Sequence, residues 1–156
     1  MHHHETRLVP YTPDQMFDLV ADVARYPEFL PWVTAARIKS KTEDGFVADV
    51  LVGFTSFREK FGSRVTLDRA THTIVAEYIE GPFKYLKNVW RFEPNGKGGC
   101  TIDFDIKFEF KFRVLEKLIG SLFDRAVMKM TDAFENRAAA LYGKTVTMPA
   151  PSGEAG

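Results

Sequence analysis

The residues whose side chains could do chemistry are few and widely spaced. His2, His3 and His4 have the side chains of a metal site, but no cysteine or carboxylate partner is evident nearby, so this trio is interpreted as a tag remnant or a frayed terminus. His72 falls in an expected turn between polar and charged neighbours, which favours a solvated loop residue over a general base. Cys100 begins an expected strand and has no histidine at a readable spacing, so a nucleophilic thiol is not expected.

Catalytic motifs are also missing from the sequence. It contains no HExxH, CxxC or paired-carboxylate pattern, and the glycine-rich turn at 95–99 lacks the Lys-Ser/Thr pair of a phosphate-binding loop. Glu59 lies on the apolar side of an expected strand, where a carboxylate is costly unless it is bonded, so it sits either at a pocket mouth or against a structural partner. An apolar pocket with a few polar groups, such as Glu59, Tyr78 and Asn88, fits a binder of a hydrophobic molecule better than an enzyme.

Length and charge place these residues in one domain of ordinary composition. At 156 residues the chain can bury a substantial core, and its 21 Lys and Arg balance 21 Asp and Glu, which gives no general attraction to nucleic acid or anionic membranes. The single cysteine excludes an internal disulfide and suits a reducing compartment. No apolar run reaches the roughly 18 residues of a membrane span, and no signal peptide is recognised before the first strand. We therefore expect a cytoplasmic domain; the family resemblance described below adds a peripheral position at the inner membrane as the alternative.

The first part of the chain is expected to form a strand and one or two short helices. A strand over 5–9 ends at a proline, and Thr12 followed by Pro13 supplies a helix N-cap and the residue favoured at the first helical position. The segment Tyr26–Trp32 then combines two prolines with three aromatic residues. Because surface loops are seldom this aromatic, these side chains must bury against something, either as a cap on the core or as the lip of a pocket.

From position 36 the apolar residues alternate with polar ones, which indicates about six consecutive antiparallel strands. The broken alternation at 53–56 indicates a bulge or a wide turn. The last strand alternates most regularly: between positions 101 and 112 every even-numbered residue is apolar and every odd-numbered residue is polar. Each strand thus presents one apolar face to the same side of a sheet.

The stretch 114–142 has the i, i+3, i+4, i+7 spacing of one long amphipathic helix. At about 1.5 Å per residue it would be roughly 40 Å long, so it needs an equally long apolar surface. Gly120 inside it costs up to about 1 kcal/mol relative to alanine, so packing must outweigh local propensity there. Gly143 supplies a C-cap, and residues 144–156 are expected to be disordered, which leaves a domain over 1–143.

Together these elements predict an α+β fold, in which a curved antiparallel sheet of six or seven strands wraps around a long C-terminal helix. A bent sheet leaves a space beneath the helix, and periodicity does not tell whether that space is hollow. The many aromatic residues and Met130 favour a cavity, because they leave irregular gaps more readily than small aliphatic residues do. A filled core is the alternative.

Three segments have distinctive sequences: YPEFLPW at 26–32, GPFKYLKNVWRF at 81–92 and AFENRA at 133–138. Together they resemble the coenzyme Q-binding protein family of the START-like superfamily, which also holds polyketide cyclases and lipid-transfer domains. The resemblance covers roughly residues 3–143 and implies a helix-grip fold with a deep hydrophobic tunnel closed by the last helix. It also implies non-catalytic binding of ubiquinone or a precursor, as a lipid chaperone that supports respiration or quinone synthesis without a catalytic cofactor.

The same family includes bacterial ribosome association toxins, proposed to bind the large ribosomal subunit and block subunit joining. The motifs do not separate the two roles. A polyisoprenoid needs a long apolar groove whereas ribosomal RNA favours a basic face, so the zero net charge favours the quinone hypothesis. A cyclase-type enzyme is a third hypothesis; it requires convergent polar groups with at least one strongly shifted pKa, and only Glu59 is a candidate.

On the quinone hypothesis, the isoprenoid tail lies between the final helix and the inner sheet face, and the ligand enters past the Tyr26–Trp32 lip, whose aromatics could also touch a membrane. The quinone carbonyls accept hydrogen bonds from Tyr78 or Asn88, and Glu59 could donate only when protonated. The expected ligand-binding set, assigned from strand and helix parity, is Tyr26, Phe29, Trp32, Glu59, Phe61, Tyr78, Asn88, Trp90, Phe92, Phe104, Phe108, Leu118, Leu122 and Met130.

Overall fold

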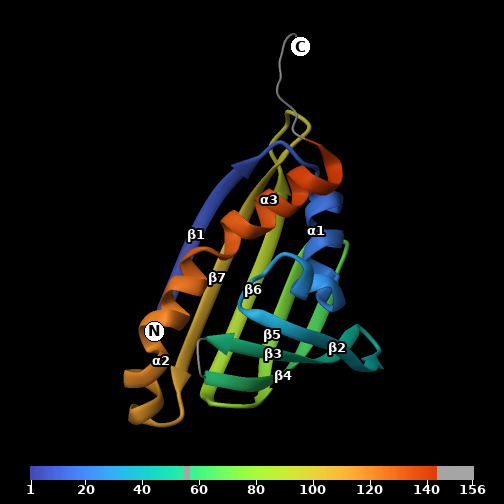
Figure 1. Ribbon diagram of the computed structural model, residues 1–156. Helices are drawn as coiled ribbons and strands as arrows, with labels where there is room; N and C mark the ends of the chain where they lie inside the picture. Colours follow the sequence, from blue (N-terminus) through green and yellow to red (C-terminus); the bar gives the residue numbers. More distant parts are fainter. Residues whose placement is uncertain (55–56, 144–156) are drawn as a thin grey trace.

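The computed structural model describes residues 1–54 and 57–143, and it has the α+β architecture expected from the sequence (Figure 1). Its elements are β1 (His2–Val9), α1 (Pro13–Ala21), the 3-10 helix η1 (Val23–Glu28), β2 (Val33–Thr42), β3 (Gly45–Phe54), β4 (Phe57–Asp68), β5 (Thr73–Glu80), β6 (Phe83–Pro94), β7 (Cys100–Phe110), α2 (Arg113–Met128) and α3 (Met130–Tyr142). The expected tail over 144–156 and the core of the expected turn at 53–56 lie outside the described residues.

The strands form one antiparallel sheet in the order β1-β7-β6-β5-β4-β3-β2. On β7 buried side chains alternate with less buried ones along the whole strand, as the sequence pattern predicts. β6 adds its own inner row in register, so that Trp90 lies opposite Phe104 and Leu86 opposite Phe108. The long β6–β7 ladder is thus the centre of the apolar face on which the helices lie.

The sheet is strongly curved, and the helices occupy its hollow side (Figure 1). Figure 1 shows α1 and α3 lying across the upper part of the central strands, while β3 and β2 turn across the lower part. α1 begins where the sequence predicts, because Thr12 and Gln15 form a reciprocal capping box: the Gln15 N–H donates to Thr12 Oγ1 at 3.1 Å, and the Thr12 N–H donates to Gln15 Oε1 at 2.9 Å.

The expected single helix over 114–142 is wrong, because the chain forms two helices that meet at Lys129 (φ −96°, ψ 0°). The Lys129 N–H closes α2 by donating to the carbonyls of Arg125 and Ala126 at 3.1 and 3.2 Å. From β1, the Arg7 guanidinium reaches Asp132 at 2.6 Å in the first turn of α3 and so joins the start of the second helix to the sheet edge. None of the described helices is long and apolar enough to cross a membrane.

The chain start is ordered into the sheet, so the expectation of a frayed terminus at the three histidines is wrong. β1 begins at His2 and pairs with β7. His2 Nε2 lies 2.6 Å from Asp105 Oδ1 and His4 Nε2 lies 2.5 Å from Asp103 Oδ1, so the missing carboxylate partners come from a strand about one hundred residues away in sequence. Among the described residues, no three metal-ligating side chains come together.

The expected tunnel between the sheet and the C-terminal helices is filled by aromatic rings. The Phe123 ring of α2 packs on Phe108 and Phe83, with centroids 4.9 and 5.1 Å apart. The Phe134 ring of α3 packs on Trp90 at 5.1 Å. Edge-to-face and tilted rings interlock closely at these distances, so many aromatic residues here produce a dense layer rather than irregular gaps.

Candidate functional site

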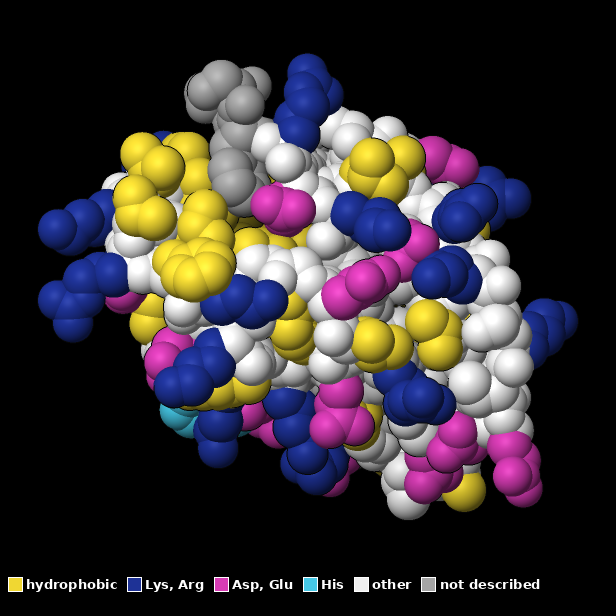
Figure 2. All heavy atoms as spheres, turned by 90° about the horizontal axis from the view of Figure 1, so that it is seen from below, with side chains coloured by type: hydrophobic (Ala, Val, Ile, Leu, Met, Phe, Trp, Pro, Cys, Tyr) yellow, Lys and Arg dark blue, Asp and Glu magenta, His cyan; other side chains and the backbone are white. Residues whose placement is uncertain are grey.

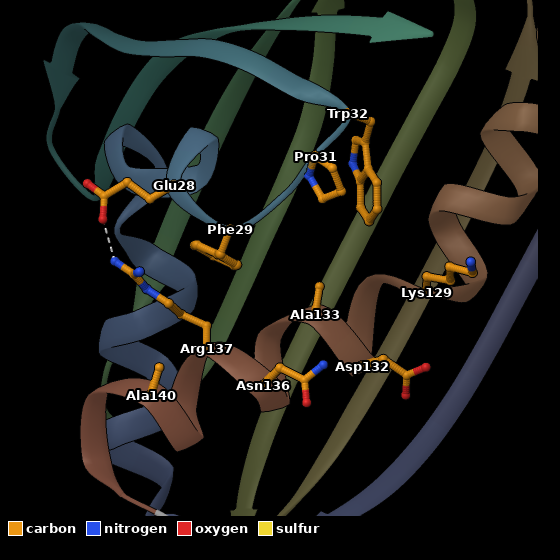
Figure 3. Close-up of a pocket in the computed structure, with 10 residues that line it drawn as sticks. All are labelled: Glu28, Phe29, Pro31, Trp32, Lys129, Asp132, Ala133, Asn136, Arg137 and Ala140. Atoms are coloured by element: carbon orange, nitrogen blue, oxygen red, sulfur yellow. Dashed lines mark hydrogen bonds and ion pairs between the residues drawn. The ribbon is translucent and has the colours of Figure 1, made fainter. Parts of the chain in front are cut away.

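A surface groove of about 640 Å³ lies between the loop that follows η1 and the outer side of α3 (Figure 3). In Figure 3 the Trp32 ring from the loop and the Ala133 side chain from α3 point into the same space. We call this space the Trp32 groove. Its lining consists of Glu28, Phe29, Pro31, Trp32, Lys129, Asp132, Ala133, Asn136, Arg137 and Ala140.

A second hollow of about 310 Å³ lies beside the Trp32 groove and shares Pro31, Trp32 and Lys129 with it. The additional lining comes mostly from α2 and consists of Gly53, Leu122, Arg125 and Ala126. Trp32 therefore stands between two hollows that together run along α3 and across the α2–α3 junction. This size and shape suit an elongated ligand, because small-molecule sites typically hold about 300–1,000 Å³.

The Trp32 side of the groove is held by buried anchors. The Tyr26 hydroxyl donates to the Val20 carbonyl at 2.5 Å, and burial raises the pKa of that hydroxyl, which keeps it a donor. Leu30 is buried in the core, and the Gly53 N–H on β3 donates to the Trp32 carbonyl at 2.9 Å. The loop backbone is therefore fixed on both sides of Phe29, while the half-buried Trp32 ring remains on the surface.

The α3 side of the groove is shaped by small side chains. Ala133, Asn136, Arg137 and Ala140 follow i, i+3, i+4, i+7 spacing and line one face of the helix. Phe134 points to the opposite side, where its ring centroid lies 5.1 Å from that of Phe29. Because alanine stops at Cβ, the helix leaves open space opposite the aromatic loop.

The charges in the groove are largely paired. Arg137 Nη2 donates to Glu28 Oε1 at 2.5 Å, and the same guanidinium lies 5.1 Å from the Phe29 ring centroid. Asp132 accepts from Arg7 at 2.6 Å. With both carboxylates held by arginines, the Lys129 ammonium and the Asn136 carboxamide remain as donors that a bound acceptor oxygen could use.

Inside the domain, a much smaller cavity of about 100 Å³ lies beneath α1 and η1. Asn88 and Trp90 line it with Tyr26 and residues of the central strands, but the side-chain polar atoms of these three residues are already engaged. The Asn88 Nδ2 donates to the Asp105 carbonyl at 2.9 Å, and Asn88 Oδ1 accepts from Trp90 Nε1 at 2.8 Å. This cavity is too small for a quinone ring with its tail.

The structure disperses the residues of the expected binding set. Phe29 and Trp32 line the Trp32 groove and Leu122 lines the second hollow, whereas Tyr26, Asn88 and Trp90 border the inner cavity. The others expected beneath the helix belong to the filled core or pack on it: Phe61, Tyr78, Phe92, Phe104, Phe108 and Met130.

Two expected residues lie elsewhere. Helix parity assigns Leu118 to the side of the helix that faces the sheet, but its side chain is 68% exposed, because that side of α2 runs instead through Ile119 and Phe123. Glu59 is half-buried near the start of β4, on the same strand face as Phe61. Its charge contributes to raising the pKa of Tyr78, after the larger effect of burial.

Sequence reasoning missed the α3 face of the groove and the helix junction. The signal that could have found them is the row Ala133, Asn136, Arg137 and Ala140, whose small and polar side chains recur at helical spacing. Such a row more commonly marks a solvated helix face. Only the approach of the Pro31–Trp32 loop, about one hundred positions earlier in the chain, makes it one wall of a groove.

The expectation for His72 is also changed by the structure. This residue adopts a left-handed backbone (φ 51°), is half-buried, and places Nε2 2.8 Å from Asp14 Oδ1 in α1. Its ring also packs edge-on against Phe17 at 6.1 Å. His72 thus joins the β4–β5 turn to α1, and it is not among the residues that line the Trp32 groove.

A seven-stranded antiparallel sheet that curves around C-terminal helices is the START-like, helix-grip class of fold. A START superfamily protein from Mycobacterium smegmatis superposes with a TM-score of 0.76 over 90% of this chain and 98% of that one, at 20% identity. The profile of the family described as polyketide cyclase / dehydrase and lipid transport matches residues 9–135, and the chain therefore belongs to this family.

Two curated relatives have different names. Ribosome association toxin RatA of Rickettsia prowazekii (strain Madrid E) is 41% identical over 136 residues, which cover 85% of this chain and 92% of that protein. The mitochondrial coenzyme Q-binding protein COQ10 homolog B of Xenopus laevis is 34% identical over 144 residues, which cover 90% of this chain and 59% of that protein. The family profile thus shows that the chain belongs to the polyketide cyclase / dehydrase and lipid transport family, and the two relatives carry names for two different roles.

Proposed function

We propose that the protein binds an isoprenoid quinone, ubiquinone or a precursor, in the Trp32 groove and carries it without changing it chemically. The observation that carries this proposal is the groove of about 640 Å³ together with its neighbour of about 310 Å³. Both are bordered by Trp32, and apolar surface continues from Phe29 to Leu122. The family description and the printed name of the Xenopus relative support a lipid of this class.

The polar lining suits a quinone head group. Quinone carbonyl oxygens only accept hydrogen bonds, and the Lys129 ammonium and the Asn136 carboxamide are donors on the wall of the groove. They replace Tyr78 and Asn88 in this role, because the Asn88 carboxamide already bonds to the Asp105 carbonyl and Trp90. The tail would extend past Trp32 toward Leu122 and Ala126.

The test is extraction of the full chain with organic solvent after purification from a ubiquinone-producing host, followed by mass spectrometry of the extract. Ala133→Trp fills the groove opposite Trp32, and it should lower the extracted quinone at least about ten-fold, since a loss of about 1.4 kcal/mol in binding is sufficient. Ala70→Trp, in an exposed turn, is the matched control and should retain the quinone. The proposal fails if the unaltered protein contains no isoprenoid quinone.

A second candidate is association with the ribosome, which the name of the Rickettsia relative favours; the resemblance described above implies the large subunit. The surface that fits it is the outer face of β1, β6 and β7, where Lys87, Arg91 and Lys107 border a hollow of about 440 Å³. The same hollow is lined by Asp103 and Asp105, whose carboxylates lie 2.5 and 2.6 Å from Nε2 of His4 and His2, so the three cations are the groups left for an anionic partner. Cations of this kind suit phosphate contacts. Lys87→Glu combined with Lys107→Glu should then abolish co-sedimentation with large subunits, and co-sedimentation that persists would argue against this surface.

A further inference from the structure

α2 is apolar on two sides. Ile119 and Phe123 face the core, which is what an amphipathic helix on a sheet requires. A neighbouring face nevertheless presents large apolar side chains at the start of the helix: Val114 is 61% exposed, Leu118 68% and the N-cap residue Phe112 59%. We call these three residues, together with Lys111, Arg113 and Lys117, the α2 tip. Single exposed apolar residues are common, but three within seven positions form a patch.

The α2 tip also carries a local positive charge. Lys111, Arg113 and Lys117 are exposed and alternate with the apolar residues, whereas Glu116 is the only carboxylate between positions 111 and 118, so three cations face one anion in a chain of zero net charge. Glu109, just before this segment, lies 3.6 Å from Lys84 Nζ. Figure 2 shows hydrophobic side chains gathered at one edge of this end of the molecule, with Lys and Arg side chains around them.

An apolar stripe connects the α2 tip with the second hollow. Val114, Leu118 and Leu122 follow i, i+4, i+8 spacing, so an apolar stripe runs along the outer side of α2 from the tip to the second hollow, which Leu122 lines. The tip lies at the lower end of the molecule in Figure 1, opposite the end where α3 finishes. The apolar stripe therefore connects a surface that contacts the tip with the second hollow beside the Trp32 groove.

We propose that the α2 tip docks the protein on an anionic lipid surface. Phe112, Val114 and Leu118 would enter the boundary between head groups and acyl chains, while the lysines and the arginine would meet lipid phosphates at the level of the head groups. RNA would satisfy the cations but would leave the apolar side chains without a counterpart, which is why a membrane fits better. This docking is a property of the surface and stands whether or not the groove holds a quinone.

The first test is co-sedimentation of the full chain with vesicles of phosphatidylcholine mixed with phosphatidylglycerol, compared with pure phosphatidylcholine. We expect binding to the anionic vesicles that weakens with salt. Combined Phe112→Ser and Leu118→Ser should lower partitioning more than about ten-fold, and Lys111→Glu should lower it at least about five-fold. Leu141→Ser and Lys97→Glu, exposed positions at the other end of the molecule, are the matched controls and should bind normally.

A second measurement locates the contact. Phe112→Trp places an indole at the tip, and brominated lipid in the same vesicles should quench its fluorescence beyond the level seen for the unaltered protein, whose tryptophans are Trp32 and Trp90. Circular dichroism of each variant separates lost docking from lost folding. Absence of vesicle binding by the unaltered protein would overturn the proposal, as would quenching confined to Trp32. Loss of large-subunit co-sedimentation in the tip variants, without vesicle binding, would reassign the surface to RNA.

Discussion

Glu5 on β1 accepts hydrogen bonds at the point where the N-terminal strand meets α3. Its carboxylate accepts from Thr131 Oγ1 at 2.7 Å and from Arg7 Nη2 at 2.9 Å, and His3 Nε2 lies 3.4 Å away. Burial by itself would raise the pKa of Glu5, but the hydrogen bonds from Thr131, His3 and Arg7 together hold it below its ordinary value of 4.5. Since Thr131 is fully buried, these bonds fasten the first turn of α3 to the sheet edge.

The depressed pKa of Glu5 gives a pH-dependent contribution to stability. A carboxyl group with a lower pKa in the folded state stabilises the fold above its unfolded pKa and loses that contribution as pH falls through the folded value. Glu5→Gln should therefore lower the free energy of unfolding by about 2 kcal/mol at neutral pH, with a difference that shrinks in acid. Urea unfolding at both pH values measures it, with the exposed Glu43→Gln as control; an equal difference at both would contradict the assignment.

Cys100 is a second residue whose chemistry is set by its surroundings. Its side chain is completely buried at the start of β7, and burial raises the pKa of the thiol to about 11. Thiolate formation is therefore disfavoured near neutral pH. Alkylation by iodoacetamide should be at least about one hundred-fold slower in the folded protein than in the unfolded chain, because both access and ionisation are reduced. Mass spectrometry with and without guanidinium chloride measures this ratio, and rapid alkylation of the folded protein would show an open β7 end.

The loop and α3 form the two walls of the groove, and one ion pair joins them. Arg137 is only 16% exposed, reaches across to Glu28, and covers the Phe29 ring. Glu28 is itself about half exposed, so solvent screens the pair and its contribution to global stability is small. Its main effect is on local order, because it holds the loop at a fixed distance from the helix.

Arg137→Met should therefore loosen the loop more than it destabilises the protein. Methionine keeps most of the apolar contact with Phe29 but removes the bond to Glu28. We expect faster amide hydrogen exchange in the Tyr26–Trp32 segment, with a change of about 1 kcal/mol or less in the free energy of unfolding. Arg64→Met, which removes an exposed arginine from β4, is the control. Unchanged exchange in the loop would show that the buried anchors alone set its position.

Local rules predicted the elements whose causes are local. The capping box at Thr12 fixes the start of α1, and the alternation from 101 to 112 fixes β7, because both depend on residues within a few positions. The break at Lys129 was not predictable in this way, since lysine is a good helix former and the contacts that turn α3 come from β1. The groove was likewise not predictable, because it forms only where the fold brings Trp32 opposite Ala133. Whether aromatic residues fill a core or leave it hollow depends on how their rings pack in three dimensions. The periodicity of the sequence carries no information about that packing.

At the scale of the whole molecule, the inner cavity and the Trp32 groove lie on opposite sides of aromatic rings that η1, the loop after it and α3 place on the sheet. The inner cavity of about 100 Å³ is bordered by Tyr26, Ala76 and Trp90, and the Trp32 groove is on the surface. Phe29 and Phe134, with ring centroids 5.1 Å apart, belong to the layer between them. A ligand held in the groove would leave the inner cavity unchanged, whereas a ligand drawn into the fold would have to enlarge it.

Ala76→Val distinguishes these two arrangements. Valine suits the β5 strand and fills part of the inner cavity, so stability should stay within about 1.5 kcal/mol of the unaltered protein, as for other small changes of core volume. If the ligand lies in the Trp32 groove, Ala76→Val should retain the same amount of extractable quinone, while Ala133→Trp loses it. Thermal unfolding and mass spectrometry of the two variants side by side measure both quantities. A loss of quinone in Ala76→Val with normal stability would move the ligand to the interior, because only a tail that passes through the aromatic layer would meet the added methyl groups.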